Sequence, residues 1–489
     1  MILTAEQMKA AEEAAFASGK TAEGLMEIAG EGIARCIRQF FPKAGTAVVF
    51  CGKGHNGGDA LVAARHLREA GWHLVIRLVS MIGELAPLTR RHLEETGVDP
   101  SETLRDFGDG PLIAIDGLLG IGATGAPRGN VADRIRELNG LRVAGAFTVA
   151  VDLPSGLEAT TGEVFDPCVQ ADLTVTMGFA KTGLLADGAT GHVGRLAVVP
   201  LPEVLAPEGD EASVTTAPSL RPLLPIRNFD THKGNYGRIG IVAGSCGYLG
   251  AARLCSAAAV HAGGGLVTLY ALPETYEQLS LLAIPEVMVQ RVDSYHQVLE
   301  ERHDVLAIGP GLGRRHDDEV RHLIENVPMP CVVDADALNA VSRDVTLLER
   351  CAGPRLLTPH PGEMERLDPR EMRSRRLWAE EFTARYPVTL LLKGARTIVA
   401  EKEYPSCFNT TGNPGMGSGG MGDVLTGVCA ALIGAGKTPR EAALLGAWIC
   451  GRAAESALVN AGASQESLSA TALIAHLGKA FDSLRSGDY

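Results

Sequence analysis

The pattern of apolar and polar positions changes its period along this chain, and each change predicts an element. Thr4 and Gln7 form a capping-box pattern ahead of a helical stretch, and Thr21 opens a second amphipathic stretch that runs to about Phe41. Short β-rich runs then alternate with helical ones. The predicted strands are 46–51, 73–80, 111–116, 147–152, 172–178 and 195–200, with predicted helices at 60–71 and 134–140. This alternation predicts a parallel sheet with helices on both faces.

Residues 201–225 interrupt the pattern, because they are rich in Pro, Ala and acidic residues and lack periodicity. We interpret this segment as a domain junction. A second α/β pattern follows in the runs 238–244, 266–272, 304–313, 330–339, 355–363 and 389–397, and a glycine-rich stretch with a helix closes it. No period of roughly 20 to 50 residues recurs, so the halves are two different α/β units. The predicted domains are 1–212 and 218–489.

Composition narrows the possible partners. A length of 489 residues exceeds one core and suggests two or three domains of about 150 residues each. The net charge of -13 makes nucleic acid a poor partner. The N-terminus lacks a basic region and an apolar core, and no run approaches the roughly 18 apolar residues of a membrane span, so we expect a cytoplasmic protein. The ten cysteines are scattered singly, which predicts reduced thiols without disulfides or structural zinc.

Residues 51–60, with the sequence CGKGHNGGDA, follow a predicted strand and precede a predicted helix. Their glycines satisfy the G-x-G-x-x-G spacing of a dinucleotide fingerprint. A dehydrogenase would place an acidic residue for the ribose at the end of the next strand, but that strand ends at Ser80. Hydride transfer is therefore disfavoured. The polar residues inside this loop, His55, Asn56 and Asp59, suggest a cation or a polar ligand in addition to a phosphate.

Two later strand ends also carry polar side chains, with Asp116 after one strand and Asp152 and Ser155 after another. Because the carboxyl ends of parallel strands open onto one crevice, these residues and Asn56 can converge on a single pocket. The alternative is that each residue only caps its own loop.

The stretch 412–427, with the sequence GNPGMGSGGMGDVLTG, contains one carboxylate, Asp423, and leads into an apolar helix. Glycines let the backbone approach a phosphate, and a helix N-terminus favours anions. Asp423 then stands where phosphoryl transfer needs a proton acceptor, and we expect the helix N-terminus to keep its pKa low. The alternative is a tight turn capped by an aspartate.

Other polar residues of the second half have ordinary explanations. His232 and His360 can be loop histidines that bond the backbone, although the prolines beside His360 favour a rigidly placed contact. Lys233 can be a solvated surface lysine. Asp334 and Asp336 follow an apolar strand and are either turn caps or metal ligands.

The motifs of residues 1–210 resemble the YjeF N-terminal family of NAD(P)H-hydrate epimerases, whose pattern NNGGDG appears here as HNGGDA. The resemblance implies potassium ligands at Asn56, Asp116 and Ser155. The implied hydrate-binding residues are His55, Asn56, Gly57, Gly58, Asp59, Gly120, Ile121, Gly122, Ala123, Thr124, Gly125, Ala126 and the catalytic Asp152. Three departures, His55 for Asn, Ala60 for Gly and Ile121 for Thr, leave the cation site whole and affect substrate contacts.

Residues 226–489 resemble the ribokinase-like NAD(P)H-hydrate dehydratases in seven ordered motifs, among them TPHPGE, LKGART and GNPGMGSGGMGD. The resemblance implies nucleotide binding by Lys393, Gly394, Ala395, Arg396, Thr397 and Gly422. It implies substrate contacts at Ala251, Gly311, His360 and Asp423, with Asp423 also catalytic.

The two resemblances imply an α/β protein with a Rossmann-like N-terminal domain and a ribokinase-like C-terminal domain. The implied function is repair of NADHX and NADPHX, the hydrates of NADH and NADPH: the first domain epimerises them and the second dehydrates the S form. Implied cofactors are K⁺, ADP with ATP as the alternative, and Mg²⁺. A symmetric homo-oligomer would suit the long N-terminal helices. The alternative is a small-molecule kinase whose N-terminal half is a non-catalytic binding module.

Overall fold

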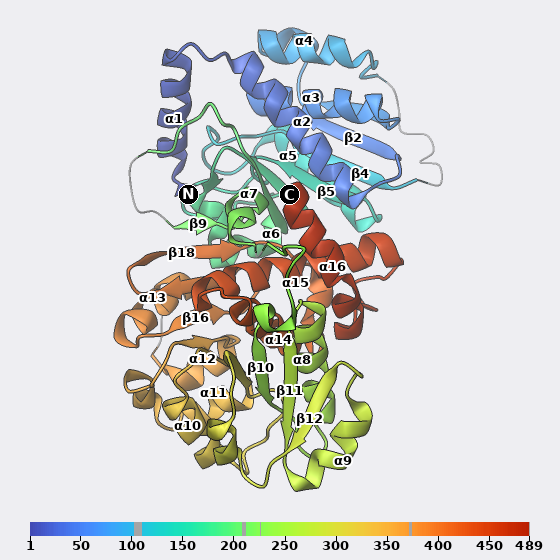
Figure 1. Ribbon diagram of the computed structural model, residues 1–489. Helices are drawn as coiled ribbons and strands as arrows, with labels where there is room; N and C mark the ends of the chain where they lie inside the picture. Colours follow the sequence, from blue (N-terminus) through green and yellow to red (C-terminus); the bar gives the residue numbers. More distant parts are fainter. Residues whose placement is uncertain (102–109, 208–211, 225, 371–373, 489) are drawn as a thin grey trace. The chain divides into compact units, whose positions relative to one another are not determined.

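The computed structural model describes residues 1–101, 110–207, 212–224, 226–370 and 374–488. These residues form two compact units, unit 1 built on Met1–Thr216 and unit 2 on Ala217–Gly487 (Figure 1). Each unit contains a sheet with a parallel core. The predicted α/β architecture with parallel sheets is confirmed.

The sheet of unit 1 is parallel throughout and has the strand order β3-β2-β4-β5-β6-β8. Its strands are β2 (Thr46–Cys51), β3 (His73–Leu78), β4 (Leu112–Gly117), β5 (Phe147–Val151), β6 (Leu173–Met177) and β8 (Arg195–Val199). Alternate side chains of β2 enter different cores: Val49 packs with α2 (Ala22–Phe40) and α3 (His55–Glu69), and Val48 with α5 (Gly129–Val143). The strand order reverses between β2 and β4, so ligands are expected beyond the carboxyl ends of these strands.

The N-terminal helices follow their predicted caps. α1 (Ala5–Ala17) begins with the capping box of Thr4 and Gln7, and the Thr21 hydroxyl caps α2 by accepting from Gly24 N at 3.1 Å. The next helix differs from its prediction, because α3 begins at His55 and not at residue 60. The polar loop residues of the sequence therefore lie in the first turns of a helix. A two-stranded parallel sheet of β1 (Ile2–Leu3) and β7 (Ala180–Lys181), not predicted from sequence, completes unit 1.

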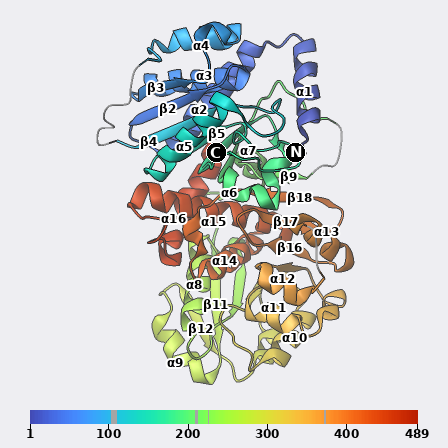
Figure 2. The same cartoon turned by 180° about the vertical axis from the view of Figure 1, so that it is seen from behind.

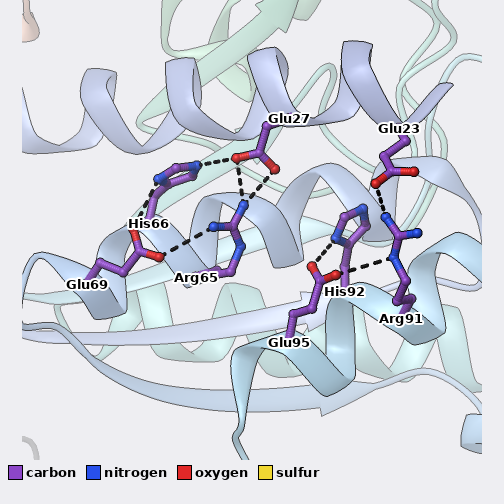
Figure 3. A network of polar contacts seen from close by, with 8 residues as sticks. All are labelled: Glu23, Glu27, Arg65, His66, Glu69, Arg91, His92 and Glu95. Atoms are coloured by element: carbon purple, nitrogen blue, oxygen red, sulfur yellow. Dashed lines mark hydrogen bonds and ion pairs between the residues drawn. The ribbon is translucent and has the colours of Figure 1, made fainter. Parts of the chain in front are cut away.

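A polar network joins three helices of unit 1 (Figure 3). Glu27 of α2 accepts from Arg65 and lies 2.9 Å from His66, both on α3. Arg91 of α4 (Pro87–Thr96) pairs with Glu23 of α2. The Arg91–Glu23 pair is largely exposed, so it contributes at most about 1 kcal/mol, whereas Arg65 and His66 are more shielded from solvent.

The sheet of unit 2 has the strand order β12-β11-β10-β13-β14-β15-β16-β17-β18. Its parallel strands are β10 (Arg238–Val242), β11 (Leu266–Ala271), β12 (Val287–Arg291), β13 (Val305–Ile308), β14 (Cys331–Val333), β15 (Arg355–Leu357) and β16 (Thr389–Leu392). An antiparallel hairpin of β17 (Thr397–Glu401) and β18 (Tyr404–Asn409) extends it. The predicted run 389–397 thus divides into a strand, a loop and the start of a second strand.

Helices cover both faces of this sheet. α8 (Leu249–His261), α14 (Met421–Gly434), α15 (Pro439–Ala461) and α16 (Ala470–Ser486) share one core with the strands. α10 (Asp317–Asn326), α11 (Asp336–Val341) and α12 (Pro361–Leu367) lie side by side in both views (Figures 1 and 2). α9 (Pro273–Leu282) packs near β11 and β12, and α13 (Arg375–Arg385) near β16 and β17.

The helix α15 contradicts the expectation that no apolar run of the chain is long enough to span a membrane. Pro439–Asn460 is long and apolar enough to pass a membrane-span test by composition, in contrast to the sequence prediction that no run approaches this length. Within its apolar window, 89% of the residues are buried inside the structure. Its hydrophobicity is therefore accounted for by its place in the core of unit 2.

The predicted junction contains regular structure in its second half. β9 (Ser213–Val214) and α7 (Ala217–Leu220) fall within 201–225, whereas 208–211 and 225 lie outside the described residues. Ala217, Leu220 and Leu224 are buried in the core cluster of unit 2. The core of unit 2 therefore begins at Ala217, one residue before the predicted domain start.

Candidate active sites

A cavity of about 810 Å³ lies in unit 1, beyond the carboxyl ends of β2, β4 and β5. Eight of the implied hydrate-binding residues line it: His55, Asn56, Asp59, Gly120, Ile121, Gly122, Ala123 and Asp152. Thr124, Gly125 and Ala126 are exposed loop residues and are not among the residues lining this cavity, nor are Gly57 and Gly58. Residues as far apart in sequence as His55 and Asp152, which are 97 positions apart, therefore lie around one cavity.

Gly57 and Gly58 permit close packing of α3. A Cβ added to Gly57 would lie 2.4 Å from the carbonyl oxygen of Gly52, and one added to Gly58 would lie 2.5 Å from the Met26 sulfur. Any side chain here would overlap its neighbours. The glycines are therefore required by the approach of the helix to the strand loop and to α2.

Asp116 organises the loop that borders the cavity. It is fully buried, and its carboxylate accepts from Ser155 N and Ser155 Oγ, both at 2.7 Å, and from Leu118 N at 3.1 Å. Ser155 Oγ accepts from Leu119 N at 3.0 Å, and Asn56 Nδ2 donates to Leu119 O at 2.8 Å. Burial raises the pKa of Asp116 to about 6, although these hydrogen bonds oppose the rise. The three implied potassium ligands therefore meet around one loop.

Asp152 has a buried partner that sequence reasoning missed. The Lys181 ammonium, 1% exposed, pairs with Asp152 Oδ1 and donates to Thr176 Oγ1 at 3.1 Å and Met177 O at 3.2 Å. Lys181 belongs to the two-residue strand β7 and to no recognised motif. The only sequence signal for it is a lysine that closely follows an apolar strand.

Two more carboxyl groups lie near this pair. Burial raises the pKa of Asp59 well above its usual range, and the charges of Asp152 and Glu12 add to the rise, against the effect of Lys181. Glu12, from α1, also lines the cavity, and burial raises its pKa. The cavity of unit 1 is thus lined by the carboxyl groups of Glu12, Asp59 and Asp152, and the buried Lys181 pairs with Asp152 and lowers the pKa of the other two.

In unit 2 the glycine-rich stretch leads into a helix N-terminus, as its pattern predicts. α14 begins at Met421 after Gly420, whose φ of 90° favours glycine, and Asp423 lies in the first turn. A Cβ added to Gly422 would come within 3.3 Å of Lys393 Nζ. The first turn of α14 therefore adjoins the lysine of the implied nucleotide-binding loop.

Lys393 joins two acidic residues beneath this turn. Its ammonium lies 2.8 Å from Asp334 Oδ1 and 3.7 Å from Glu363 Oε2. Asp334 is 1% exposed, and its other oxygen accepts from Thr426 Oγ1 of α14 at 2.8 Å. Burial disfavours the charge of Lys393, but Asp334 and Glu363 outweigh it, so the pKa of Lys393 is raised.

The expectation of a low pKa for Asp423 is wrong. Burial raises its pKa to about 6, and the like charges of Asp334 and Asp336 add to the rise, whereas Lys393 opposes it. The helix N-terminus does not overcome these effects, and Lys393, which pairs with Asp334, lowers the pKa of Asp423 by less than burial and Asp334 raise it. A carboxylate of this kind is ionised near neutral pH and is a stronger base than an ordinary aspartate.

The loop from Lys393 to Thr397 is held from behind by Arg375. The Arg375 guanidinium donates to Lys393 O at 2.9 Å and Arg396 O at 3.1 Å. Arg396 is 3% exposed, whereas Gly394 and Ala395 are exposed. Arg375 was not identified from the sequence, because its contacts lie 17 to 21 residues along the chain.

The implied substrate positions of unit 2 fall into two groups. Gly311 and Ala251 are adjacent, since a Cβ added to Gly311 would lie 2.9 Å from that of Ala251. His360 caps α12, and its Nδ1 accepts from Gly362 N at 3.1 Å while its own N–H donates to Glu363 at 2.8 Å. The Glu363 that pairs with the His360 backbone also lies 3.7 Å from Lys393 Nζ, so the second group adjoins the lysine beside the first turn of α14.

The other polar residues singled out in unit 2 make hydrogen bonds within the protein or lie on its surface. His232 caps a 3-10 turn by accepting from Gly234 N at 3.1 Å, and Lys233 is exposed. Asp336 accepts from Gly313 N at 2.8 Å. The Asp334 carboxylate accepts from Lys393 Nζ and from Thr426 Oγ1.

Two family models match the chain. Residues 22–183 match the model described as YjeF-related protein N-terminus, and residues 239–476 match the model described as NAD(P)H-hydrate dehydratase. A bifunctional NAD(P)H-hydrate repair enzyme from Moorella thermoacetica is 39% identical over 468 residues, which cover 88% of each chain. The chain belongs to the bifunctional NAD(P)H-hydrate repair enzymes.

Further comparisons agree with this family. A repair enzyme of the same name from Escherichia coli is 36% identical, with 91% of this chain and 87% of the relative covered. The crystal structure of an ADP/ATP-dependent NAD(P)H-hydrate dehydratase from Bacillus subtilis, co-crystallised with ATP and Mg²⁺, is 28% identical with a TM-score of 0.50. It covers 56% of this chain and 100% of its own. As a repair enzyme of this family, the protein carries an epimerase domain in unit 1 and a dehydratase domain in unit 2.

Proposed function

We propose that the protein interconverts the R and S hydrates of NADH and NADPH in unit 1 and dehydrates the S hydrate with ADP in unit 2, releasing AMP and phosphate. The observation that carries the proposal is the position of Asp423 at a glycine-rich helix N-terminus beside Lys393. Epimerisation would convert the R hydrate, which the dehydratase cannot use, into the S hydrate that it can use.

The proposed dehydration uses Asp423 as a general base. A hydroxyl group leaves poorly from the hydrated ring until it is phosphorylated. Asp423 removes the hydroxyl proton as the oxygen attacks the terminal phosphoryl group of the nucleotide, and backbone N–H groups of the glycine-rich stretch stabilise the developing charge. The raised pKa of about 6 supports this role, because the group stays ionised at neutral pH and accepts a proton readily.

Mg²⁺ fits unit 2 best as part of the nucleotide complex. The described residues contain no group of three or more His, Cys, Asp or Glu side chains placed to hold a metal. Mg²⁺ is commonly held by one or two carboxylates together with phosphates and waters, and Asp336 and Asp334 are the carboxylates beside Asp423. When bound, the ion would screen the phosphate charges.

K⁺ is proposed for the loop around Asp116. The residues fit a monovalent cation, because the donors that the structure describes for this buried carboxylate are all neutral. Asn56 uses its Nδ2 for Leu119 O, which leaves its Oδ1 for a ligand. Asn56, Asp116 and Ser155 would hold the ion, which would fix the loop. Asp152 on the cavity wall is the proposed catalytic group of epimerisation.

The test is an absorbance measurement near the dihydronicotinamide band. The purified full chain is mixed with the hydrates of NADH and with ADP or ATP in separate samples. We expect the absorbance to return, faster with ADP, and both epimers to be consumed. Accumulation of a stable phosphorylated product without dihydronicotinamide would favour the small-molecule kinase.

A further inference from the structure

The wall of the cavity in unit 1 combines carboxyl groups from three elements: Glu12 from α1, Asp59 from α3 and Asp152 from the end of β5. Lys181 from β7 does not line the cavity and pairs with Asp152. No sequence motif assigns Lys181 a role, and the fingerprint loop assigns Asp59 only to binding. An inference about their chemistry rests on the proposed epimerisation and extends it.

Lys181 fixes one oxygen of Asp152 and leaves the other oxygen available. Asp152 Oδ1 accepts from Lys181 Nζ, from Thr176 Oγ1 at 2.9 Å and from Met177 N at 3.4 Å. No described residue donates to Oδ2. The backbone of Asp152 has a φ of 67°, which only glycine and a few polar residues adopt readily, so the contacts on Oδ1 hold a strained residue in place. Asp152 is thus a fixed carboxylate on the cavity wall with one oxygen free for a ligand.

Asp59 has the opposite environment within the same cavity. The structure describes no hydrogen bond or ion pair for its side chain, and burial with two neighbouring carboxyl groups raises its pKa. It therefore favours the neutral acid. Two carboxyl groups whose surroundings differ in this way divide the tasks of proton acceptor and proton donor.

We propose that Asp152 and Asp59 are the proton acceptor and donor of epimerisation, and that Lys181 is a positioning residue that assigns the acceptor role to Asp152. The hydrate carries its hydroxyl on the ring carbon bonded to nitrogen. Asp152 takes the hydroxyl proton as the carbon–nitrogen bond breaks, the electron pair goes to nitrogen, and Asp59 donates a proton to that nitrogen.

The product of this step is an open-chain aldehyde. Rotation about the adjacent carbon–carbon bond exposes the other face of the aldehyde, and the reverse steps close the ring. Nitrogen returns its proton to Asp59, and Asp152 returns its proton to oxygen. Each group regains its starting state without a co-reactant, which suits a site that needs no nucleotide.

The first test is Lys181→Met in the full chain, with the exposed Lys9→Met as control. We expect the kcat of epimerisation to fall by about 10²- to 10⁴-fold with little change in KM, since binding is kept while the base is misplaced. Lys181→Arg should recover part of the rate, and dehydration of pure S hydrate in the same sample should be unchanged. A folded Lys181→Met variant with normal kcat would overturn the proposal.

A second variant keeps the proposal testable if Lys181→Met does not fold, because removing one member of a buried ion pair leaves a charge uncompensated. Asp59→Asn preserves shape and lies on the cavity wall. We expect a kcat loss of similar size, with the exposed Asp133→Asn as control. Normal turnover by Asp59→Asn would exclude it as donor.

The pH profile separates positioning from a structural effect. In the wild type, epimerisation should fall at high pH as Asp59 loses its proton. Glu12, Asp152 and Lys181 act on the charge of Asp59, and His55, Lys53, Glu84 and Arg128 line the same cavity. Lys181→Met should move the alkaline limb to higher pH, because the charge of Lys181 lowers the pKa of Asp59, and Asp59→Asn should abolish that limb. Profiles identical to the wild type in both variants would refute the assignment.

An isotope measurement tests the chemical step. The wild-type protein epimerises the hydrate in water labelled with ¹⁸O, and the hydroxyl oxygen of the product is examined by mass spectrometry. Retention of the original oxygen supports ring opening, whereas incorporation of label in step with each epimerisation would overturn it. A wild-type protein that epimerises no hydrate at all would instead refute the proposed function of unit 1.

Discussion

The two units each place a lysine among several carboxyl groups, fully buried in unit 1 and half-buried in unit 2, but the lysine has a different partner in each. In unit 1, Lys181 pairs with Asp152, the carboxylate that lines the cavity. In unit 2, Lys393 pairs with Asp334, and Asp423 in the adjacent helix turn keeps a raised pKa of about 6. The lysine therefore pairs with the proposed catalytic carboxylate itself in unit 1 and with a neighbour of that carboxylate in unit 2, where the pKa of Asp423 stays raised.

Asp423→Asn should show the largest effect, because it removes the titrating carboxylate of unit 2 and retains its shape. We expect dehydration to fall by about 10²- to 10⁴-fold, while ADP binding and epimerisation persist. Calorimetric titration with ADP and a dehydration assay measure the two outcomes. Asp318→Asn, an exposed aspartate in the first turn of α10, is the matched control. Loss of ADP binding would make Asp423 a structural cap.

Asp116→Ala tests whether unit 1 depends on a second cation besides Lys181. If K⁺ balances the charge of Asp116, the variant should lose about 10-fold or more of the epimerisation rate and its response to potassium. Dehydration should not change. Epimerisation rates measured across potassium concentrations provide the readout. A wild-type rate that is indifferent to potassium would mean that Asn56, Asp116 and Ser155 only organise their loop.

Asp334→Asn should shift the pH dependence of dehydration. The rate should fall about tenfold per pH unit below the pKa of Asp423, because only the ionised base accepts a proton. Asp334 raises that pKa, so its removal should move the acidic limb to lower pH. Asp336→Asn should produce a smaller shift in the same direction, since its effect on the pKa is weaker. An acidic limb that stays in place in both variants would contradict the electrostatic account of Asp423.

Separating the units should have the smallest effect on activity. A fragment that ends near residue 212 should epimerise without nucleotide, and one that begins near 218 should dehydrate only the S hydrate. Because Ala217 is 2% exposed in the core of unit 2, a fragment that begins at 212 should melt at a higher temperature than one that begins at 218. Thermal melts and chromatographic separation of the epimers test both points. A folded first fragment without epimerase activity would favour a non-catalytic module.

Local sequence signals located much of the fold and of both sites. Periodicity placed the strands of the parallel sheets, and the glycine-rich stretch placed Asp423 at a helix N-terminus. The pKa of Asp423 escaped prediction because it depends on Asp334 and Asp336, which are far away in sequence. The role of Lys181 could not be predicted from the sequence, because it depends on how a two-residue strand packs against Asp152. Short sequence patterns predict helix caps and strand ends. Ion pairs between segments that are distant in sequence can be identified only from the three-dimensional structure.

The buried methyl group of Ala60 shows how the glycine of a family motif can be replaced by alanine. Ala60, fully buried, stands where the family pattern has glycine, and a Cβ added to Gly117 would lie 2.4 Å from the Ala60 methyl. Only one of the two positions has room for a methyl group. The pair should tolerate a swap, Ala60→Gly with Gly117→Ala, better than Gly117→Ala alone. The departure from the pattern at residue 60 is therefore a matter of shared space between a helix and a strand end, and leaves the inventory of reacting groups unchanged.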